Sequence, residues 1–323
     1  MLVANVPNGP TNSLPILLSL DFQMHQSDLQ AENAFCEEKR VPLTVRPALR
    51  SLKPESGLEH SSRDPQTLPY YAEEILDFML TTETVHAPGA DYMTQQSDIN
   101  YKMRAILVDW LVTVHLKFKL LPETLFQTVN LIDRYLSKRL VTRQQLQLVG
   151  VTGMLLACKY EEIYPPEVKD FVHITDRAYT REQVVQMECE ILGALEFSLT
   201  SPSAWRFLER FLSIAQTDDT YQHFARYLLE LSLVEYHMLK YRLSLIAASA
   251  TYIAMRAHRR DWSWSPALAK ASKYSESQLK LCVKDLLILF QSAPRHTLSG
   301  VRDKFARREY MEVAKIKLEY SFH

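Results

Sequence analysis

The stretch LVGVTG at residues 148–153 recurs 97 positions later as LIAASA at residues 245–250. The match continues without a gap, so that Asp133 falls on Glu230 and Lys159 on Arg256. Farther along, at an offset of 95, YTREQ at residues 179–183 falls on YSESQ at residues 274–278. Two unrelated apolar helices can resemble each other by chance, but matched helix starts argue against that explanation. We infer that the chain holds two copies of one structural unit.

Both copies carry helix signals, and no alternating strand pattern of useful length is present. Pro122 suits the first turn of a helix, and Thr-x-x-Gln capping boxes begin at Thr142 and Thr180. Asp98 is placed to cap a helix that runs to about Leu116. Small residues recur in the third helix of each copy, at positions 150, 153 and 157 and at 247, 250 and 254. The pattern predicts an all-α fold with one central helix in each bundle.

The composition excludes several classes of protein. Lys plus Arg is 37 and Asp plus Glu is 38, which leaves no broad basic surface for nucleic acid. The 7 glycines are scattered and cannot form a phosphate loop. The 4 cysteines form no C-x-x-C pair, which fits a reducing compartment. The longest nearly uncharged apolar stretch, 243–255, is shorter than the roughly 18 residues of a membrane span. We therefore expect an intracellular protein with no membrane span, no metal and no cofactor.

Composition also divides the chain into segments. Residues 1–66 hold seven of the 15 prolines and lack hydrophobic periodicity, which predicts a disordered regulatory segment. Residues 67–99 read as a helix and a linker, because apolar residues recur there at helical spacing. The two copies occupy 100–200 and 201–296, and residues 297–323 form a C-terminal helix or tail.

The segment MRAILVDW at residues 103–110 has apolar side chains around nearly its whole circumference. A surface helix of a globular protein carries an apolar stripe on one side only. Either this helix is buried on all sides, or one of its apolar faces binds a partner. The residues alone leave both readings open.

Four segments together resemble the first cyclin box of A- and B-type cyclins: MRAILVDW at 103–110, IDRYL at 132–136, LQLVG at 146–150 and KYEEIYPPE at 159–167. KFKLL at 117–121 and Tyr160 are closer to the B-type. The similarity extends from about residue 71 to about residue 317. It implies a mitotic, B-like cyclin with two tandem five-helix cyclin boxes preceded by an N-terminal helix.

The resemblance implies a regulatory subunit, not an enzyme, that binds and activates a cyclin-dependent protein kinase in G2/M control. Such a subunit holds the kinase C-helix inward, which assembles the Lys–Glu ion pair that phosphoryl transfer needs. Lys159 and Glu188 would hydrogen-bond the C-helix, although without the family context they read as ordinary solvated charges. The residues at matching positions of the kinase-binding surface are Ile75, Leu156, Lys159, Tyr160, Glu188, Leu192, Phe197 and Leu199.

The family also implies a docking groove for Arg-x-Leu-type substrate or inhibitor peptides. The matching residues are Met103, Ile106, Leu107, Trp110 and Gln147. Thr113 stands where A-type cyclins carry a glutamate that pairs with the basic residue of the peptide. Arg104 and Asp133 are implied to form a buried ion pair that supports the first box.

Arg46-Pro47-Ala48-Leu49 meets the minimal Arg-x-x-Leu form of a destruction box, which would be recognised by a ubiquitin ligase. The family context leads us to expect the protein in the nucleus and the cytoplasm. One alternative is a cyclin-fold transcription adaptor that binds DNA or a pocket peptide, because residues 295–319 hold seven Lys or Arg against four Asp or Glu. A helical-bundle enzyme with a metal site is a more remote one.

Overall fold

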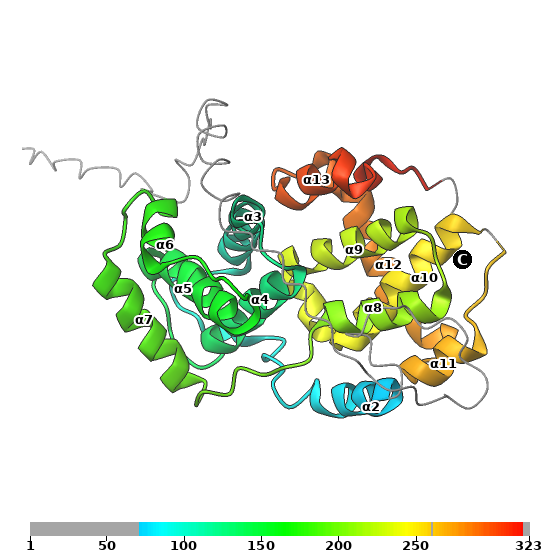
Figure 1. The fold of residues 1–323 in the computed structure, drawn as a ribbon, viewed down its shortest axis with the longest axis horizontal. Coiled ribbons are helices and arrows are strands. Elements are labelled where there is room, and N and C mark those ends of the chain that lie inside the picture. The colour runs from blue at the N-terminus through cyan, green and yellow to red at the C-terminus, as the bar shows by residue number, and fades with distance from the viewer. Residues whose placement is uncertain (1–70, 260, 319–323) are drawn as a thin grey trace, which may run out of the picture. The chain divides into compact units, whose positions relative to one another are not determined.

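The computed structural model describes residues 71–259 and 261–318, and all regular elements in these ranges are helical. Residues 1–66 and the Arg46–Leu49 motif lie outside the described ranges. The first box consists of α3 (Tyr101–Phe118), α4 (Pro122–Leu136), α5 (Arg143–Glu161), α6 (Val168–Ile174) and α7 (Arg181–Ala194) (Figure 1). The second consists of α8 (Ala204–Ala215), α9 (Asp219–Val234), α10 (Leu243–His258), α11 (Pro266–Ser272) and α12 (Glu276–Ser292). The remaining elements are α2 (Ala72–Thr82), η3 (Tyr92–Gln95), η4 (Tyr236–Lys240), η5 (Ala293–Arg295), α13 (Gly300–Phe305), η6 (Arg308–Tyr310) and η7 (Val313–Lys315).

Helix α5 is the central helix of the first box and packs against α3, α4, α6 and α7 (Figure 1). Two glycines make this packing possible. A Cβ added at Gly150 would lie 2.6 Å from Leu107 Cδ1, and one at Gly153 would lie 2.9 Å from Ile132 Cγ1. Both distances are too short for real side chains, so α3 and α4 can approach α5 this closely only because these positions are glycine.

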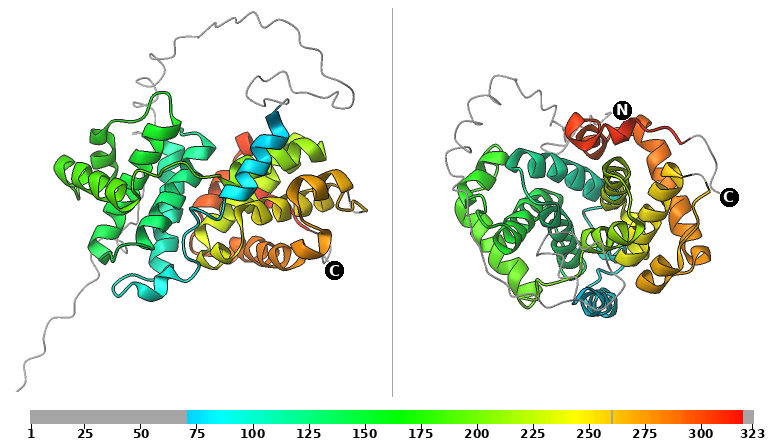
Figure 2. Two further views of the ribbon diagram at one scale, coloured as in Figure 1. Left: turned by 90° about the horizontal axis from the view of Figure 1, so that it is seen from below. Right: turned by 45° about the vertical axis from the view of Figure 1, so that its right-hand side comes forward.

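The second box repeats this arrangement around α10, which packs against α8, α9, α11 and α12. Its alanines at 247, 250 and 254 are fully buried. The N-terminal helix α2 lies on the second box, where Leu76 joins the core of that box (Figure 2). Helix α13 packs against both α3 of the first box and α9 of the second. Helix α13 therefore ties the two copies together.

Most predicted helix starts are confirmed. Pro122 occupies the first turn of α4, and capping boxes begin α5 at Thr142 and α7 at Thr180. The expectation for Asp98 is wrong. Helix α3 begins after Asn100, whose side chain accepts from the backbone N–H groups of the second and third helical residues at 3.0 and 3.1 Å. Asp98 instead accepts from the backbone N–H of Arg143 at 2.8 Å, at the start of α5.

The start of α10 depends on a residue far away in the sequence. Arg242 provides no side-chain cap, and the carboxylate of Glu83 supplies one. It accepts from the backbone N–H of Ser244 at 2.9 Å and from the Ser244 hydroxyl at 2.7 Å. Burial raises the pKa of Glu83, although these hydrogen bonds oppose the shift. The segment after α2 is thus part of the second box's structure.

The described residues contain neither a membrane-spanning helix nor a cluster of metal-binding side chains. None of their helices is both long and apolar enough to cross a membrane. Within the same ranges, no group of three or more His, Cys, Asp or Glu side chains is arranged to hold a metal ion.

Candidate partner-binding surfaces

An ion pair joins α5 and α7 on the outside of the first box. Lys159, in the last turn of α5, places its Nζ 2.6 Å from Glu188 Oε1 and 2.9 Å from Oε2. The Lys159 side chain is 46% exposed and that of Glu188 is 13% exposed. An exposed pair of this kind contributes about 0.2–1 kcal/mol to stability. The two charges therefore reach a common outer surface, and their bond is weak enough to be exchanged for contacts with a partner.

Several apolar side chains on α5, on α7 and in the segment after α7 are also accessible. Tyr160 and Phe197 are exposed, and Leu192 and Leu199 are half-buried. The Tyr160 hydroxyl lies 2.6 Å from the hydroxyl of Thr200, which ties α5 to the segment after α7. The structure thus brings six of the eight predicted kinase-binding residues together on neighbouring elements. We call them the α5–α7 surface: Lys159, Tyr160, Glu188, Leu192, Phe197 and Leu199.

The two other predicted residues lie elsewhere. Leu156 is 3% exposed and belongs to the core of the first box, so the expectation that it contributes to an outer surface is wrong. It sits one turn before Lys159, on the side of α5 that faces its neighbours. Ile75 lies on α2 and is 41% exposed. The segment after α2 approaches the α5–α7 surface, because His86 Nε2 lies 3.4 Å from the Ser198 hydroxyl.

Phe197 is held in an unusual backbone conformation. Glu196 and Phe197 have φ values of 53° and 57°, in the left-handed region that bulky residues rarely adopt. Such a residue costs about 1–3 kcal/mol and persists only where its surroundings fix it. Here the N–H of Phe197 donates to the carbonyl of Leu192 at 2.9 Å. The side chains of Arg134 and Gln127 hold the carbonyls of residues 198 and 199, each at 2.6 Å. The result is a 73% exposed aromatic ring on a fixed backbone.

The loop that follows α5 presents two residues that the sequence reasoning missed. Ile163 and Tyr164 are 81% and 79% exposed. The loop is anchored because the Glu162 carboxylate accepts from the N–H of Leu121 at 2.7 Å and from the Thr124 hydroxyl. The signal was the pair of prolines at 165 and 166, which ends α5 and leaves these residues outside any helix.

The predicted docking groove is only partly exposed. Met103, Ile106 and Trp110 share a half-buried face of α3. Leu107 is fully buried against Gly150, so the expectation that it lines an open groove is wrong. Gln147 is also buried, and its Oε1 has no hydrogen-bond partner in the described part of the chain. The segment 103–110 is therefore not buried on all sides, since one face is core and the other reaches the surface, and binding of a partner by that exposed face stays a prediction.

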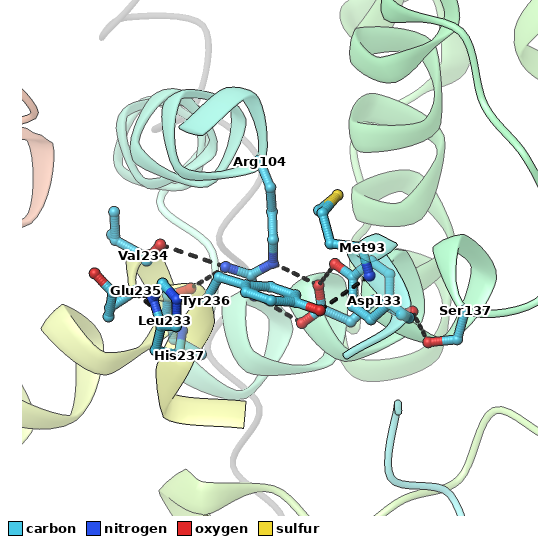
Figure 3. Close-up of polar contacts among 10 residues, drawn as sticks. Met93, Arg104, Asp133, Ser137, Leu233, Val234, Glu235, Tyr236 and His237 are labelled. Carbon is cyan, nitrogen blue, oxygen red and sulfur yellow. Dashed lines mark hydrogen bonds and ion pairs between the residues drawn. The ribbon is translucent and has the colours of Figure 1, made fainter. Parts of the chain in front are cut away.

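Arg104 and Asp133 form the expected buried ion pair (Figure 3). Arg104 Nε donates to Asp133 Oδ1 at 2.6 Å, and Nη2 donates to Oδ2 at 2.7 Å. Their side chains are 1% and 2% exposed. Burial alone would lower the pKa of Arg104, but the Asp133 carboxylate raises it above its ordinary value. Arg104 Nη1 also donates to the carbonyl of Leu233 at 2.9 Å, so the pair connects the first box to α9 of the second.

A second buried ion pair occupies the matching place in the second box. Lys304 Nζ lies 2.6 Å from Glu230 Oε1, and both side chains are 2% exposed. Glu230 is the residue that falls on Asp133 in the internal repeat, so the acidic member of this pair could be located from the sequence. Its partner comes from α13, which lies outside the repeat and gave no signal. Burial raises the pKa of Glu230, although Lys304 opposes the shift.

Asp109 anchors the start of α13 to the first box. Its Oδ1 accepts from the backbone N–H of Gly300 at 2.8 Å. A Cβ at Gly300 would lie 2.8 Å from the carbonyl oxygen of Asp109, so this close approach requires glycine. Burial raises the pKa of Asp109 to about 6. The start of α13 is therefore fixed against α3 of the first box.

Comparisons with known proteins identify the fold. The family described as "Cyclin, N-terminal domain" matches residues 74–200, and "Cyclin, C-terminal domain" matches residues 202–319. Cyclin-B2-1 of Arabidopsis thaliana is 41% identical over 309 residues, which cover 94% of this chain and 69% of that protein. The chain belongs to the cyclin family.

Among its relatives, B-type cyclins recur, which confirms the B-like resemblance. Cyclin-B2-1 of Oryza sativa subsp. japonica is 47% identical over 79% of this cyclin and 60% of that protein. G2/mitotic-specific cyclin-B of Dictyostelium discoideum is 41% identical over 81% and 61%. The chain thus spans about 60% of the length of these two relatives. A viral cyclin from herpesvirus saimiri shares the fold, with a TM-score of 0.61 at 19% identity over 67% of this chain and 96% of that one.

Proposed function

We propose that this cyclin is the regulatory subunit of a cyclin-dependent protein kinase with a mitotic role. In this proposal it binds the kinase C-helix through the α5–α7 surface and holds that helix inward. The supporting observation is the Lys159–Glu188 pair, which reaches the outer surface of the first box, where Tyr160 and Phe197 are also exposed. At this place the lysine can donate hydrogen bonds to a partner helix and the carboxylate can accept them, while the aromatic rings cover the apolar side chains of that helix.

The energetics of activation are within reach of such a surface. Moving a two-state equilibrium from 1:99 to 99:1 requires about 5.5 kcal/mol of differential binding. A standard interface with a few buried anchors can supply this, particularly where the anchors are held before binding. The fixed backbone at Phe197 and the anchored loop at Glu162 provide that preorganisation. The kinase then supplies all the chemistry, and the cyclin selects its active conformation.

A second part of the proposal concerns substrate recruitment through the exposed face of α3. Met103, Ile106 and Trp110 would receive the apolar residue of an Arg-x-Leu-type peptide, whereas the buried Gln147 would support this face from below without touching the peptide. Thr113 is exposed on the same helix and offers no negative charge for the basic residue. We further propose recognition of the Arg46–Leu49 motif by a ubiquitin ligase, and a location in nucleus and cytoplasm.

The adaptor alternative loses part of its support in the structure. It rested on the excess of basic residues in the C-terminal segment. Lys304 is buried in the pair with Glu230, and Lys315 pairs with Glu312 at 2.8 Å. Burial of Lys304 therefore removes one charge from the basic excess, whereas the Lys315–Glu312 pair lies inside the counted segment and leaves its net charge unchanged. No specific observation on the described residues favours DNA binding.

Activation of purified candidate cyclin-dependent kinases tests the proposal. The full chain should stimulate phosphorylation of a standard substrate, and Lys159→Ala combined with Glu188→Ala should reduce the stimulation at least about tenfold. Lys315→Ala combined with Glu312→Ala removes another exposed ion pair and serves as the matched control. Unchanged activation by the first double variant would show that the α5–α7 surface is not the kinase site.

A further inference from the structure

A cavity of about 240 Å³ lies where the two boxes and the segment after α2 meet. We call it the junction cavity. Its walls come from the segment 83–88, helix α4, the connection at 201–204, the end of α9 and the stretch 238–246. Apolar side chains dominate the lining, among them Phe126, Val129, Met238, Leu243 and Ile246. None of these elements fills the space, although the cores on either side are tightly packed.

The buried charges on the wall already have partners. Arg104 and Asp133 neutralise each other, as Figure 3 shows, and the Glu83 carboxylate accepts two hydrogen bonds from Ser244. Two further charges line the cavity: Lys240 pairs with Asp285 at 2.7 Å, and Arg242 is exposed to solvent. A charged group held against the buried part of the wall would lose its hydration without meeting an unpaired buried counter-charge, which is costly in an apolar site. A neutral ligand pays no such penalty. The wall of the junction cavity thus favours a ligand that is both neutral and mainly apolar.

The volume of the junction cavity limits the size of the ligand. A cavity of about 150 Å³ lined by aliphatic and aromatic side chains holds one benzene molecule. The larger junction cavity therefore has room for a bicyclic aromatic ring system. We propose that the junction cavity is a binding site for a neutral, mainly apolar small molecule of this size.

The position of the cavity gives occupancy a structural consequence. Gln127 and Asn130 of α4 form part of its wall. The same two side chains hold the segment after α7, because Gln127 Nε2 donates to the carbonyl of Leu199 at 2.6 Å and Asn130 Oδ1 accepts from the Ser201 hydroxyl at 3.1 Å. A ligand between these elements would stabilise the segment that carries Phe197. An effect of the ligand on kinase activation rests on the proposed function, whereas binding of the ligand in the junction cavity does not.

Titration of the methyl-labelled full chain with indole, followed by NMR without any kinase, tests the proposal. Saturable shifts are expected, with nuclear Overhauser effects from indole to the methyl groups of Val129, Leu243 and Ile246. Indole-3-acetate and tryptamine, which carry a charge, should bind at least about tenfold more weakly. Absence of saturable binding, or contacts to methyl groups elsewhere in the protein, would overturn the proposal, as would equal binding of the charged probes.

A filling variant provides a second test. Ser232 lines the cavity from α9 and is 8% exposed, so Ser232→Leu should occupy part of the space and weaken indole binding at least about tenfold. Ser213→Leu makes the same substitution on an exposed position of α8 and should leave binding unchanged. Retained affinity in a folded Ser232→Leu protein would place indole outside the cavity. The methyl contacts in the unmodified protein decide the matter if this variant does not fold.

Discussion

Exchanging the two charges of the α5–α7 surface separates their internal role from their role toward a partner. The variant combines Lys159→Glu with Glu188→Lys. Either single change places like charges side by side, which costs about 1 kcal/mol at 4 Å in water. The double exchange restores an ion pair between α5 and α7, and exposed pairs contribute about 0.2–1 kcal/mol. The free energy of unfolding should therefore stay within about 1 kcal/mol of the original protein.

Kinase binding should respond quite differently. A partner that complements a lysine on α5 and a carboxylate on α7 would meet like charges at both places. Loss of a paired interfacial charge costs about 2–5 kcal/mol, which corresponds to about 30-fold weaker binding or more. Urea denaturation measures the first quantity, and titration of kinase activation measures the second. An exchanged protein that is stable and activates the kinase at the original concentration would refute the reasoning, because the pair would then serve only to join α5 to α7.

Three further outcomes follow from the same structure. Trp110→Ala should weaken phosphorylation of Arg-x-Leu substrates and leave the kinase affinity, measured by calorimetry, unchanged. An equal loss of phosphorylation and of kinase affinity would show that Trp110 serves only as a core residue. Lys304→Met leaves Glu230 buried without its partner and should cost about 3–5 kcal/mol in urea denaturation, with most of this regained on adding Glu230→Leu; a loss below about 1 kcal/mol would contradict the role of the pair. The pKa of Asp109 is raised from 3.8 to about 6, so the folded state binds this proton more tightly, and stability present at pH 4 is lost as the pH rises through 6. Asp109→Asn should remove up to about 3 kcal/mol of that pH-dependent loss, and an unchanged pH profile of the unfolding free energy would refute this assignment.

Much of the fold could be predicted from short sequence signals. Capping boxes at Thr142 and Thr180 act within one turn of chain, so residue type and spacing are enough to locate them. The repeat located both central helices, because close packing demands small residues at fixed spacing. Asp98 shows the limit of local reasoning, since two nearby side chains were both able to cap α3. Asn100 lies closer to the helix, and the carboxylate is used by α5 instead.

The surfaces were harder to predict than the helices, because exposure depends on what packs against each face. Leu107 and Leu156 look the same in sequence as their exposed neighbours, and only the contacts of α5 show that they are core. Long-range partners are also invisible locally. Lys304 and Asp109 are ordinary helix charges until α13 is placed between α3 and α9.

The carboxylate of Glu83 has a practical consequence for anyone who wishes to shorten this protein. A fragment that starts at the first box would leave the buried N–H of Ser244 without its acceptor and would leave the Ser244 hydroxyl with Tyr274 as its remaining partner, in the interior of the other half. The sequence contains two copies of one unit, but the protein cannot be cut between them. Glu83 and α13 lie outside both boxes, and the two boxes depend on them.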